Sequence, residues 1–230
     1  MPSDQSHVTN RLAQFVAGSQ WETVPPEVRR EGVRGLLNFV GCALGGAQDE
    51  AMGIAVKVLT PFFGPPRGIV IGRGDRPDAL NAAFLNAVSA NALEYDDTHL
   101  GTVMHPAAPV APGLFALAGL RPVSGRELLQ AFILGVEISC RVGLGVMPTH
   151  YRRGWHITAT CGIFGAAAAC ARQSRRVTVR CRFTANGNAI RGRHKHAAHP
   201  VRSSDRVEGC GAACFGMGSI THVRTGDTKR

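Results

Sequence analysis

Six side chains that could move protons or hold a charged ligand gather within one short segment, ALEYDDTHLGTVMHPAAPVAPG at 92–113. They are three carboxylates, one hydroxyl and two imidazoles: Glu94, Asp96, Asp97, Thr98, His99 and His105. Histidine changes its charge near neutral pH, so it suits either role in proton transfer. Two interpretations compete. The segment is a solvated turn in which Asp and Thr bond local backbone, or it is a proton-transfer site.

Two histidines have positions that favour the second interpretation. His156 begins a predicted helix in GWHIT, where the helix dipole favours an anionic ligand; a helix cap or a packed histidine is the alternative. His105 precedes Pro106, which restrains the preceding backbone to extended geometry and would present the imidazole from a defined loop. A loop histidine with no task is the alternative there. Arg152 and Arg153 could bind a carboxylate, although surface solvation is the expected use.

The elements that must position these side chains are predicted to be helices. Periodicity and punctuation predict helices at 26–45, 49–60, 77–95 and 156–172. In the first of them the apolar residues at helical spacing are Val33, Leu36, Leu37, Val40 and Leu44. SGRE at 124–127 is a capping-box pattern that opens a further helix over 125–143. The segment RGIVIG at 67–72 is the one predicted strand. The expected fold class is therefore all-α, a helical bundle.

The composition agrees with closely packed helices. The chain has 230 residues, of which 44% are hydrophobic but only 6% aromatic, because alanine and glycine carry much of the apolar content. The charge-free stretches at 101–120 and 154–171 are interrupted by His, Pro and Gly, so we expect buried core rather than membrane spans. The first residues show no secretory pattern. Seven scattered cysteines fit a reduced, cytoplasmic protein better than a disulfide framework.

The net charge of +10 lies almost entirely at one end of the chain. Residues 173–230 hold 12 basic and 3 acidic residues and no leucine, whereas 16 leucines precede them. A stretch of this composition is not expected to bury a core of its own. Three interpretations remain open: a basic arm for nucleic acid, a metal-binding segment, or the wrong-frame translation of a GC-rich gene.

The metal interpretation depends on one candidate zinc set. Its members lie in HKHAAH and CGAAC: His194, His196, His199, Cys210 and Cys214. The spacing between them is irregular and no second cysteine pair frames them, so no metal site is predicted. The scattered glycines contain no G-x-x-x-x-G-K-[ST] phosphate loop either.

Several segments resemble the MmgE/PrpD family, which includes 2-methylcitrate dehydratase, cis-aconitate decarboxylase and iminodisuccinate epimerase. The matching text is NALEYDDTH at 91–99, HPAAPVAPGLFALA at 105–118, GVEISCRVG at 135–143 and GWHITATCGIFGAAAACAR at 154–172, with LLNFVGCALGGA at 36–47 similar to the second helix of the family. The resemblance covers about 8–172. It implies the family's all-helical domain over 1–172, followed by a basic tail at 173–230.

The resemblance also implies an activity and a set of site residues. It implies a lyase of the dehydratase or decarboxylase type that acts on a small di- or tricarboxylate without a metal or organic cofactor, and a homodimer for the full-length proteins. His156 and His105 would transfer protons or bind carboxylate, and Asp97 and Thr98 would hold and orient the substrate. Glu94 stands where the family often has aspartate and would help to position the substrate, with His99 beside it in support.

The tail matches none of the family's later landmarks. A Gly-rich segment with a functional lysine and a whole α+β domain with a site tyrosine have no counterpart in 173–230. We therefore favour the wrong-frame interpretation and expect this chain to be an inactive fragment of such a lyase, with nucleic acid and membrane not among its partners. The alternative is a non-catalytic helical module with a basic nucleic-acid-binding arm.

Overall fold

The structure, a computed structural model, describes residues 5–174, with side chains from Val8 onward. Its elements are α1 (Gln5–Gly18), η1 (Trp21–Thr23), α2 (Pro26–Gly46), α3 (Glu50–Leu59), η2 (Thr60–Phe62), α4 (Ala79–Asn91), α5 (Ala107–Leu120), α6 (Gly125–Val146), α7 (Thr149–Arg152) and α8 (Ile157–Gln173). These residues form no strand, so the expected all-α fold is confirmed for this part of the chain. The candidate zinc set, which was not predicted to be a metal site, and the basic arm lie outside the described residues.

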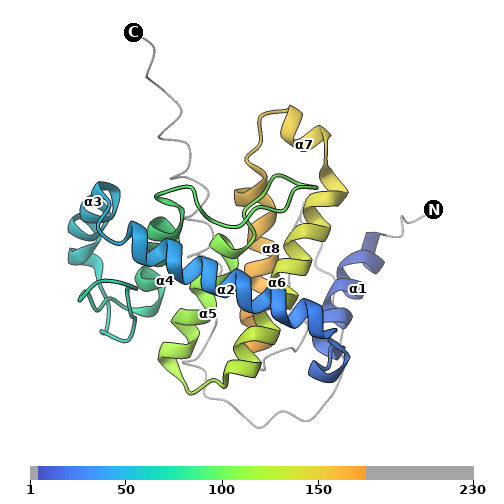
Figure 1. Ribbon diagram of the computed structural model, residues 1–230, viewed down its shortest axis with the longest axis horizontal. Helices are drawn as coiled ribbons and strands as arrows, with labels where there is room; N and C mark the ends of the chain where they lie inside the picture. Colours follow the sequence, from blue (N-terminus) through green and yellow to red (C-terminus); the bar gives the residue numbers. More distant parts are fainter. Residues whose placement is uncertain (1–4, 175–230) are drawn as a thin grey trace.

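The helices pack around a core in which small residues allow close approach. In Figure 1, α2 lies across the near side of α5 and α6, and α3 and α4 lie at the end of the bundle away from α1. The central apolar cluster includes Phe39, Leu114 and Phe132. At Gly165 of α8, an added Cβ would collide with Ser139 Oγ and with the backbone of Gly135 on α6. The pair α6–α8 therefore depends on glycine at this crossing.

The helix beginnings agree with the sequence signals. Ser124 and Glu127 form the predicted capping box: the Glu127 N–H donates to Ser124 Oγ over 3.2 Å, and the Ser124 N–H donates to Glu127 Oε2 over 3.1 Å. The side chain of Asp78 accepts from the N–H groups of Leu80 and Asn81 at the start of α4. These bonds satisfy N–H groups that a helix cannot pair within itself.

Only part of the apolar face predicted for α2 is buried. Leu36 and Val40 pack against the central cluster, while Val33, Leu37 and Leu44 are exposed. The buried face of α2 instead consists of Gly32, Phe39, Cys42, Ala43 and Gly46. This face needs small residues because α2 lies close to its neighbours. A Cβ at Gly46, for example, would collide with the carbonyl oxygen of Ser89 on α4.

The predicted strand at 67–72 is wrong. Residues 67–70 have no regular secondary structure, Ile71 and Gly72 lie in a turn, and no second segment pairs with this stretch among the described residues. Its backbone is instead satisfied by the side chain of Asn86 on α4: the Ile71 N–H donates to Asn86 Oδ1 over 2.8 Å, and Asn86 Nδ2 donates to the Ile69 carbonyl over 2.8 Å. One buried amide side chain thus replaces the neighbouring strand, and Val70 between them is buried.

Two helix boundaries around the chemically rich segment differ from expectation. α4 ends at Asn91 rather than near residue 95, so Glu94 lies in the loop after the helix and not inside it. No helix was predicted for α5. Its segment was expected only to be buried core, because prolines usually argue against a helix. Pro109 lies in the first turn, where its missing N–H costs nothing, and only Pro112 lies inside the helix.

The C-terminal end of α8 holds the N-terminal end of the domain. The guanidinium of Arg172 donates to the carbonyl oxygens of Val16, Ala17 and Ser19, with distances of 3.4, 3.1 and 2.8 Å. Gln130 of α6 donates to the Ser19 carbonyl as well, over 3.1 Å. Carbonyls at and just after the end of α1, which the helix cannot pair within itself, are therefore paired by side chains from two later helices.

One described helix, α6, is long and apolar enough by length and composition to cross a membrane, but half of that window is buried against other helices. A core helix has the same properties, and α6 packs closely against α8 and also contacts α2 and α5.

Candidate active site

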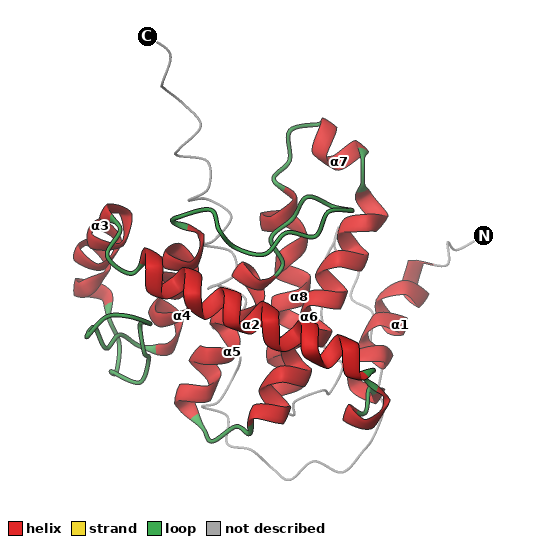
Figure 2. Cartoon of the chain, in the orientation of Figure 1, coloured by secondary structure: helices red, strands yellow, loops and turns green. Residues whose placement is uncertain are grey.

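The loop between α4 and α5 carries most of the candidate residues. Figure 2 shows this loop at the end of the bundle where α7 and the beginning of α8 lie. A tight turn closes it: the His99 N–H donates to the Met104 carbonyl over 2.9 Å, and the Thr102 N–H donates to the His99 carbonyl over 3.0 Å. Glu94 and Val103 have positive φ, 56° and 51°, which L-residues adopt rarely.

Two neighbouring carboxylates of the loop have different environments. Asp97 Oδ1 accepts from the Ala107 N–H over 3.0 Å, so it caps α5 from a distance. Burial raises the pKa of Asp97 to about 6, against the opposing effect of this hydrogen bond. Asp96 is the more enclosed, with 6% of its surface exposed. Burial raises its pKa also, and the nearby His105 opposes that shift. Both carboxyls are thus kept in places that disfavour their charge.

His105 links the loop to α8. Its Nδ1 lies 3.4 Å from Thr98 Oγ1 and 3.5 Å from Asp96 Oδ1. Its backbone N–H donates to Oγ1 of Thr158, in the first turn of α8, over 3.0 Å. The backbone is therefore fixed by α8, while the half-buried imidazole lies against the hydroxyl and carboxylate of its own loop.

His156 is the N-cap of α8. Its Nδ1 accepts from the Ala159 N–H over 3.2 Å. The structure thus confirms the cap that sequence analysis offered as the alternative, but a cap and a site are compatible here. The imidazole lies at the positive end of a helix of 17 residues, where an anionic ligand is favoured.

The structure brings some of the predicted residues together and leaves others apart. Asp97, Thr98 and His105 share the loop, and Thr158 joins them to the turn that His156 begins. His99 lies in the same loop, but its Nδ1 is hydrogen bonded to Thr102 Oγ1 at 2.8 Å. Glu94 is exposed, as are Arg152 and Arg153. The roles of all of these residues toward a substrate remain predictions.

Sequence reasoning missed three polar residues that organise this end of the bundle. Thr158 accepts from the His105 backbone. Thr160 Oγ1 lies 2.7 Å from Nε2 of His150, whose ring stacks on Trp155 at 5.9 Å between centroids. Asp96 was quoted in the acidic cluster but not assigned to the site. Threonines two and four residues after a helix-starting histidine lie in the first turn, which is the one signal that could have indicated the first two.

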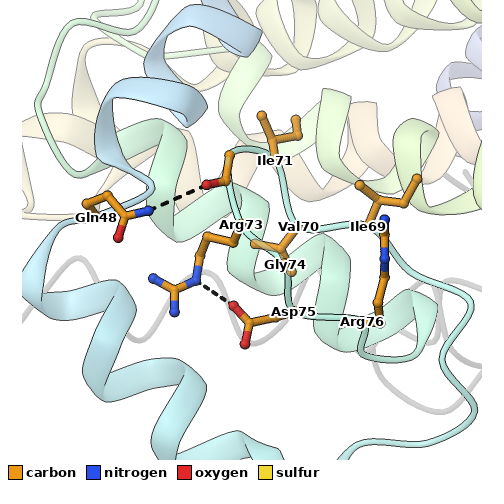
Figure 3. A pocket seen from close by; sticks show the side chains of 9 residues that line it. Gln48, Ile69, Val70, Ile71, Arg73, Gly74, Asp75 and Arg76 are labelled. Atoms are coloured by element: carbon orange, nitrogen blue, oxygen red, sulfur yellow. Dashed lines mark hydrogen bonds and ion pairs between the residues drawn. The ribbon is translucent and has the colours of Figure 1, made fainter.

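An open surface depression lies elsewhere, lined by Gln48 and residues 69–76 (Figure 3). One of its two arginines is engaged, because Arg73 Nε lies 2.6 Å from Asp75 Oδ2 and Arg73 Nη1 donates to the Ala47 carbonyl over 3.0 Å. None of the candidate site residues lines it. Within residues 5–174 no group of three or more His, Cys, Asp or Glu side chains is arranged to hold a metal ion.

The helical bundle, the polar loop between α4 and α5 and the histidine that begins α8 together define a known class of protein domain. Residues 10–179 match the MmgE/PrpD N-terminal domain, and the chain belongs to this family. Among curated relatives, the cis-aconitate decarboxylase-like protein oryM of Aspergillus oryzae is 30% identical over 181 residues, which is 74% of this chain and 36% of that protein. Cis-aconitate decarboxylase of Aspergillus terreus is 28% identical over 171 residues, 71% of this chain and 34% of the relative. The Homo sapiens cis-aconitate decarboxylase is 28% identical over 182 residues, 76% and 37% of the two chains. The chain thus spans about a third of the length of these relatives.

Proposed function

We propose that this chain is the helical part of a cofactor-independent lyase, of the dehydratase or decarboxylase type, that acts on a small di- or tricarboxylate. The family membership supports a lyase of this broad type. The observation that carries the proposal is the hydrogen bond between the His105 N–H and Thr158 Oγ1. It ties an imidazole on a loop to the first turn of a helix that starts with a second imidazole, so proton-transfer groups and an anion-favouring helix end occur together.

Cis-aconitate and 2-methylcitrate are the substrates to test first. The relatives named above are cis-aconitate decarboxylases, and 2-methylcitrate dehydratase belongs to the same family. Both compounds carry three carboxylates, which the N-terminal end of α8 would attract. Asp97 and Thr98 are proposed to orient the substrate, and Glu94 and His99 to support it from the edge of the loop.

Ligand titration by NMR tests the substrate class on the 230-residue protein. We expect the imidazole signals of His105 and His156 to shift with cis-aconitate or 2-methylcitrate, and not with acetate, which carries a single carboxylate. Replacing His156 with Gln should weaken the response of His105. If neither tricarboxylate shifts either imidazole at millimolar concentration, the proposed function is wrong.

We also propose a second copy of this chain as a partner, and the cytoplasm as its location. The exposed side chains Val33, Leu37 and Leu44 share one face of α2, and such rows commonly mark contact surfaces. The four cysteines within residues 5–174 are buried and form no disulfide, as in a reducing compartment. Sedimentation equilibrium should show a dimer that Leu37→Glu dissociates; a monomer for both chains would contradict the self-association.

A further inference from the structure

The buried carboxylate of Asp96 is the one charged group of the loop to which the proposed function gives no task. Its side chain is 2% exposed. Oδ2 receives a long hydrogen bond of 3.4 Å from Asn91 Nδ2, and Oδ1 has no hydrogen-bond partner among the described residues. A carboxylate removed from water in this way is costly unless a donor or a positive charge compensates it. Nδ1 of His105 lies 3.5 Å from Oδ1 and can supply a donor when it carries a proton.

Asp96 Oδ1 and His105 Nδ1 are too far apart for an ordinary hydrogen bond but close enough to form one after a small movement. At 3.5 Å the distance between Asp96 Oδ1 and His105 Nδ1 exceeds the usual 2.7–3.2 Å of an N–H···O bond, so the two groups are close but not hydrogen bonded. Hydrogen bonds of catalytic groups are often long without a ligand and shorten when one binds. Thr98 Oγ1, at 3.4 Å from the same nitrogen, is the competing partner: as an acceptor it favours the same tautomer of His105, and as a donor it favours the opposite one.

We propose that Asp96 is a positioning residue for His105: it accepts from Nδ1–H and so keeps the lone pair of the neutral ring on Nε2, which makes His105 the proton-transfer group of the site. This inference rests on the proposed function for its chemistry. A carboxylate behind an imidazole fixes the tautomer and stabilises the imidazolium. The proton moves between a substrate carbon next to a carboxylate and Nε2, and the electron pair of that C–H bond stays on the carbon. Asp96 balances the charge of the ring whenever the ring is protonated.

His156 is held in the opposite tautomer. Because its Nδ1 accepts from the Ala159 N–H, that nitrogen carries no proton, and the neutral ring has its proton on Nε2. Protonating Nδ1 would break the cap of α8. His156 is thus a hydrogen-bond donor, suited to bind a substrate carboxylate beside the helix end. The two histidines therefore have different tasks, which their residue type alone does not distinguish.

The second carboxylate near His105 does not share this role. Asp97 contributes to the electrostatic environment of His105, but its Oδ1 is engaged with the Ala107 N–H. Replacing Asp97 should therefore leave the tautomer of His105 unchanged. The comparison between Asp96→Asn and Asp97→Asn separates a specific contact from the mere removal of a nearby negative charge.

Tautomers can be measured directly on the 230-residue protein with ¹⁵N-labelled histidine, because protonated and unprotonated ring nitrogens have distinct chemical shifts. His105→Gln and His156→Gln assign the two rings. We expect Nδ1–H for His105 and Nε2–H for His156 without ligand. In Asp96→Asn the share of the Nε2–H form of His105 should rise several-fold, while Asp97→Asn and the remote Asp75→Asn leave it unchanged.

The outcomes separate the two proposals. Nε2–H for His105 in the unaltered protein would overturn the role of Asp96, and this measurement needs no variant to fold. An unchanged His105 in a folded Asp96→Asn would overturn it too. Adding cis-aconitate and 2-methylcitrate to the same sample then tests the function separately: a fixed Nδ1–H tautomer with no response to either compound keeps the Asp96–His105 pair and rejects the substrate class.

Discussion

The backbone N–H of His105 donates to Oγ1 of Thr158 over 3.0 Å and joins two residues that are 53 positions apart. The loop between α4 and α5 is thereby attached to the first turn of α8 through main-chain geometry. The imidazole of His105 is left to interact with Thr98 and Asp96. The position of this ring thus depends on a hydroxyl that belongs to another helix.

Thr158→Val should therefore loosen the loop. Valine keeps the shape of threonine but offers no acceptor, so the His105 N–H loses its partner, at a cost of about 1 kcal/mol in the free energy of unfolding. Thr158→Ser keeps the hydroxyl and should lie much closer to the unaltered protein. Urea unfolding measures both. Equal stability of the Val and Ser variants would show that this hydrogen bond contributes nothing.

Asp97 makes the stability of the domain depend on pH. Its pKa is raised from 3.8 to about 6, so the folded state binds the proton more tightly than the unfolded chain. The stability from this group is fully present below about pH 4 and is lost as the pH rises through about 6. A shift of roughly two pKa units corresponds to about 3 kcal/mol.

Asp97→Asn removes the charge and keeps an oxygen for the Ala107 N–H. We expect it to raise the free energy of unfolding by up to about 3 kcal/mol at pH 7.5 relative to the unaltered protein, and by much less at pH 4. Urea unfolding at both pH values checks this. A difference that does not change with pH would mean that the carboxyl of Asp97 is not perturbed in the folded state.

Gly165→Ala should destabilise the contact between α6 and α8. The new methyl group meets Ser139 Oγ and the backbone of Gly135, and overpacking of this kind costs roughly 1–3 kcal/mol. Gly41→Ala is the matched control, because Gly41 lies inside α2 with nothing within 4 Å of an added Cβ. That change should stabilise the helix by about 0.5–1 kcal/mol. Thermal unfolding of the two variants should therefore shift in opposite directions.

We expect the 230-residue chain to bind a tricarboxylate without turning it over. Glu94 and Thr98 are exposed and the side chain of His105 is 31% exposed, so water reaches the groups of the site. Exclusion of water and fixed geometry supply much of the rate of enzymes. Release of carbon dioxide or of an unsaturated product is the measurement. Turnover within the common range of about 1–10³ s⁻¹ would show that this chain completes the site by itself.

Much of the helical fold could be predicted from the sequence because its signals are local. Proline at the start of α2, the capping box of α6 and the small-residue text of α8 each determine their own segment. The strand at 67–72 could not be excluded this way, since the amide of Asn86 that replaces its partner comes from a helix 15 residues later. Nor could the sequence show that Val33, Leu37 and Leu44 of α2 are exposed, because apolar spacing predicts a face but not what covers it.

The candidate site was predictable in its residue types and not in its contacts. His105, His156, Asp97 and Thr98 are groups that proton chemistry needs, and the helix start at His156 is a local signal. Asp96 is the aspartate within 3.5 Å of His105 Nδ1, and Asp97 is bonded to the Ala107 N–H, a difference that no local pattern indicates. The cap by His156 Nδ1 and the acceptor role of Thr158 likewise require the three-dimensional arrangement.

The hydrogen bonds from Arg172 to the end of α1 can form only late during synthesis of the chain. The carbonyls of Val16, Ala17 and Ser19 leave the ribosome early, but the guanidinium that pairs them is 153 to 156 positions further along. At translation rates of roughly 5–20 residues per second, α1 waits on the order of 10–30 s for this partner. The end of α1 is thus made long before the guanidinium that pairs it, and until then the carbonyls of Val16 and Ala17 lack this partner.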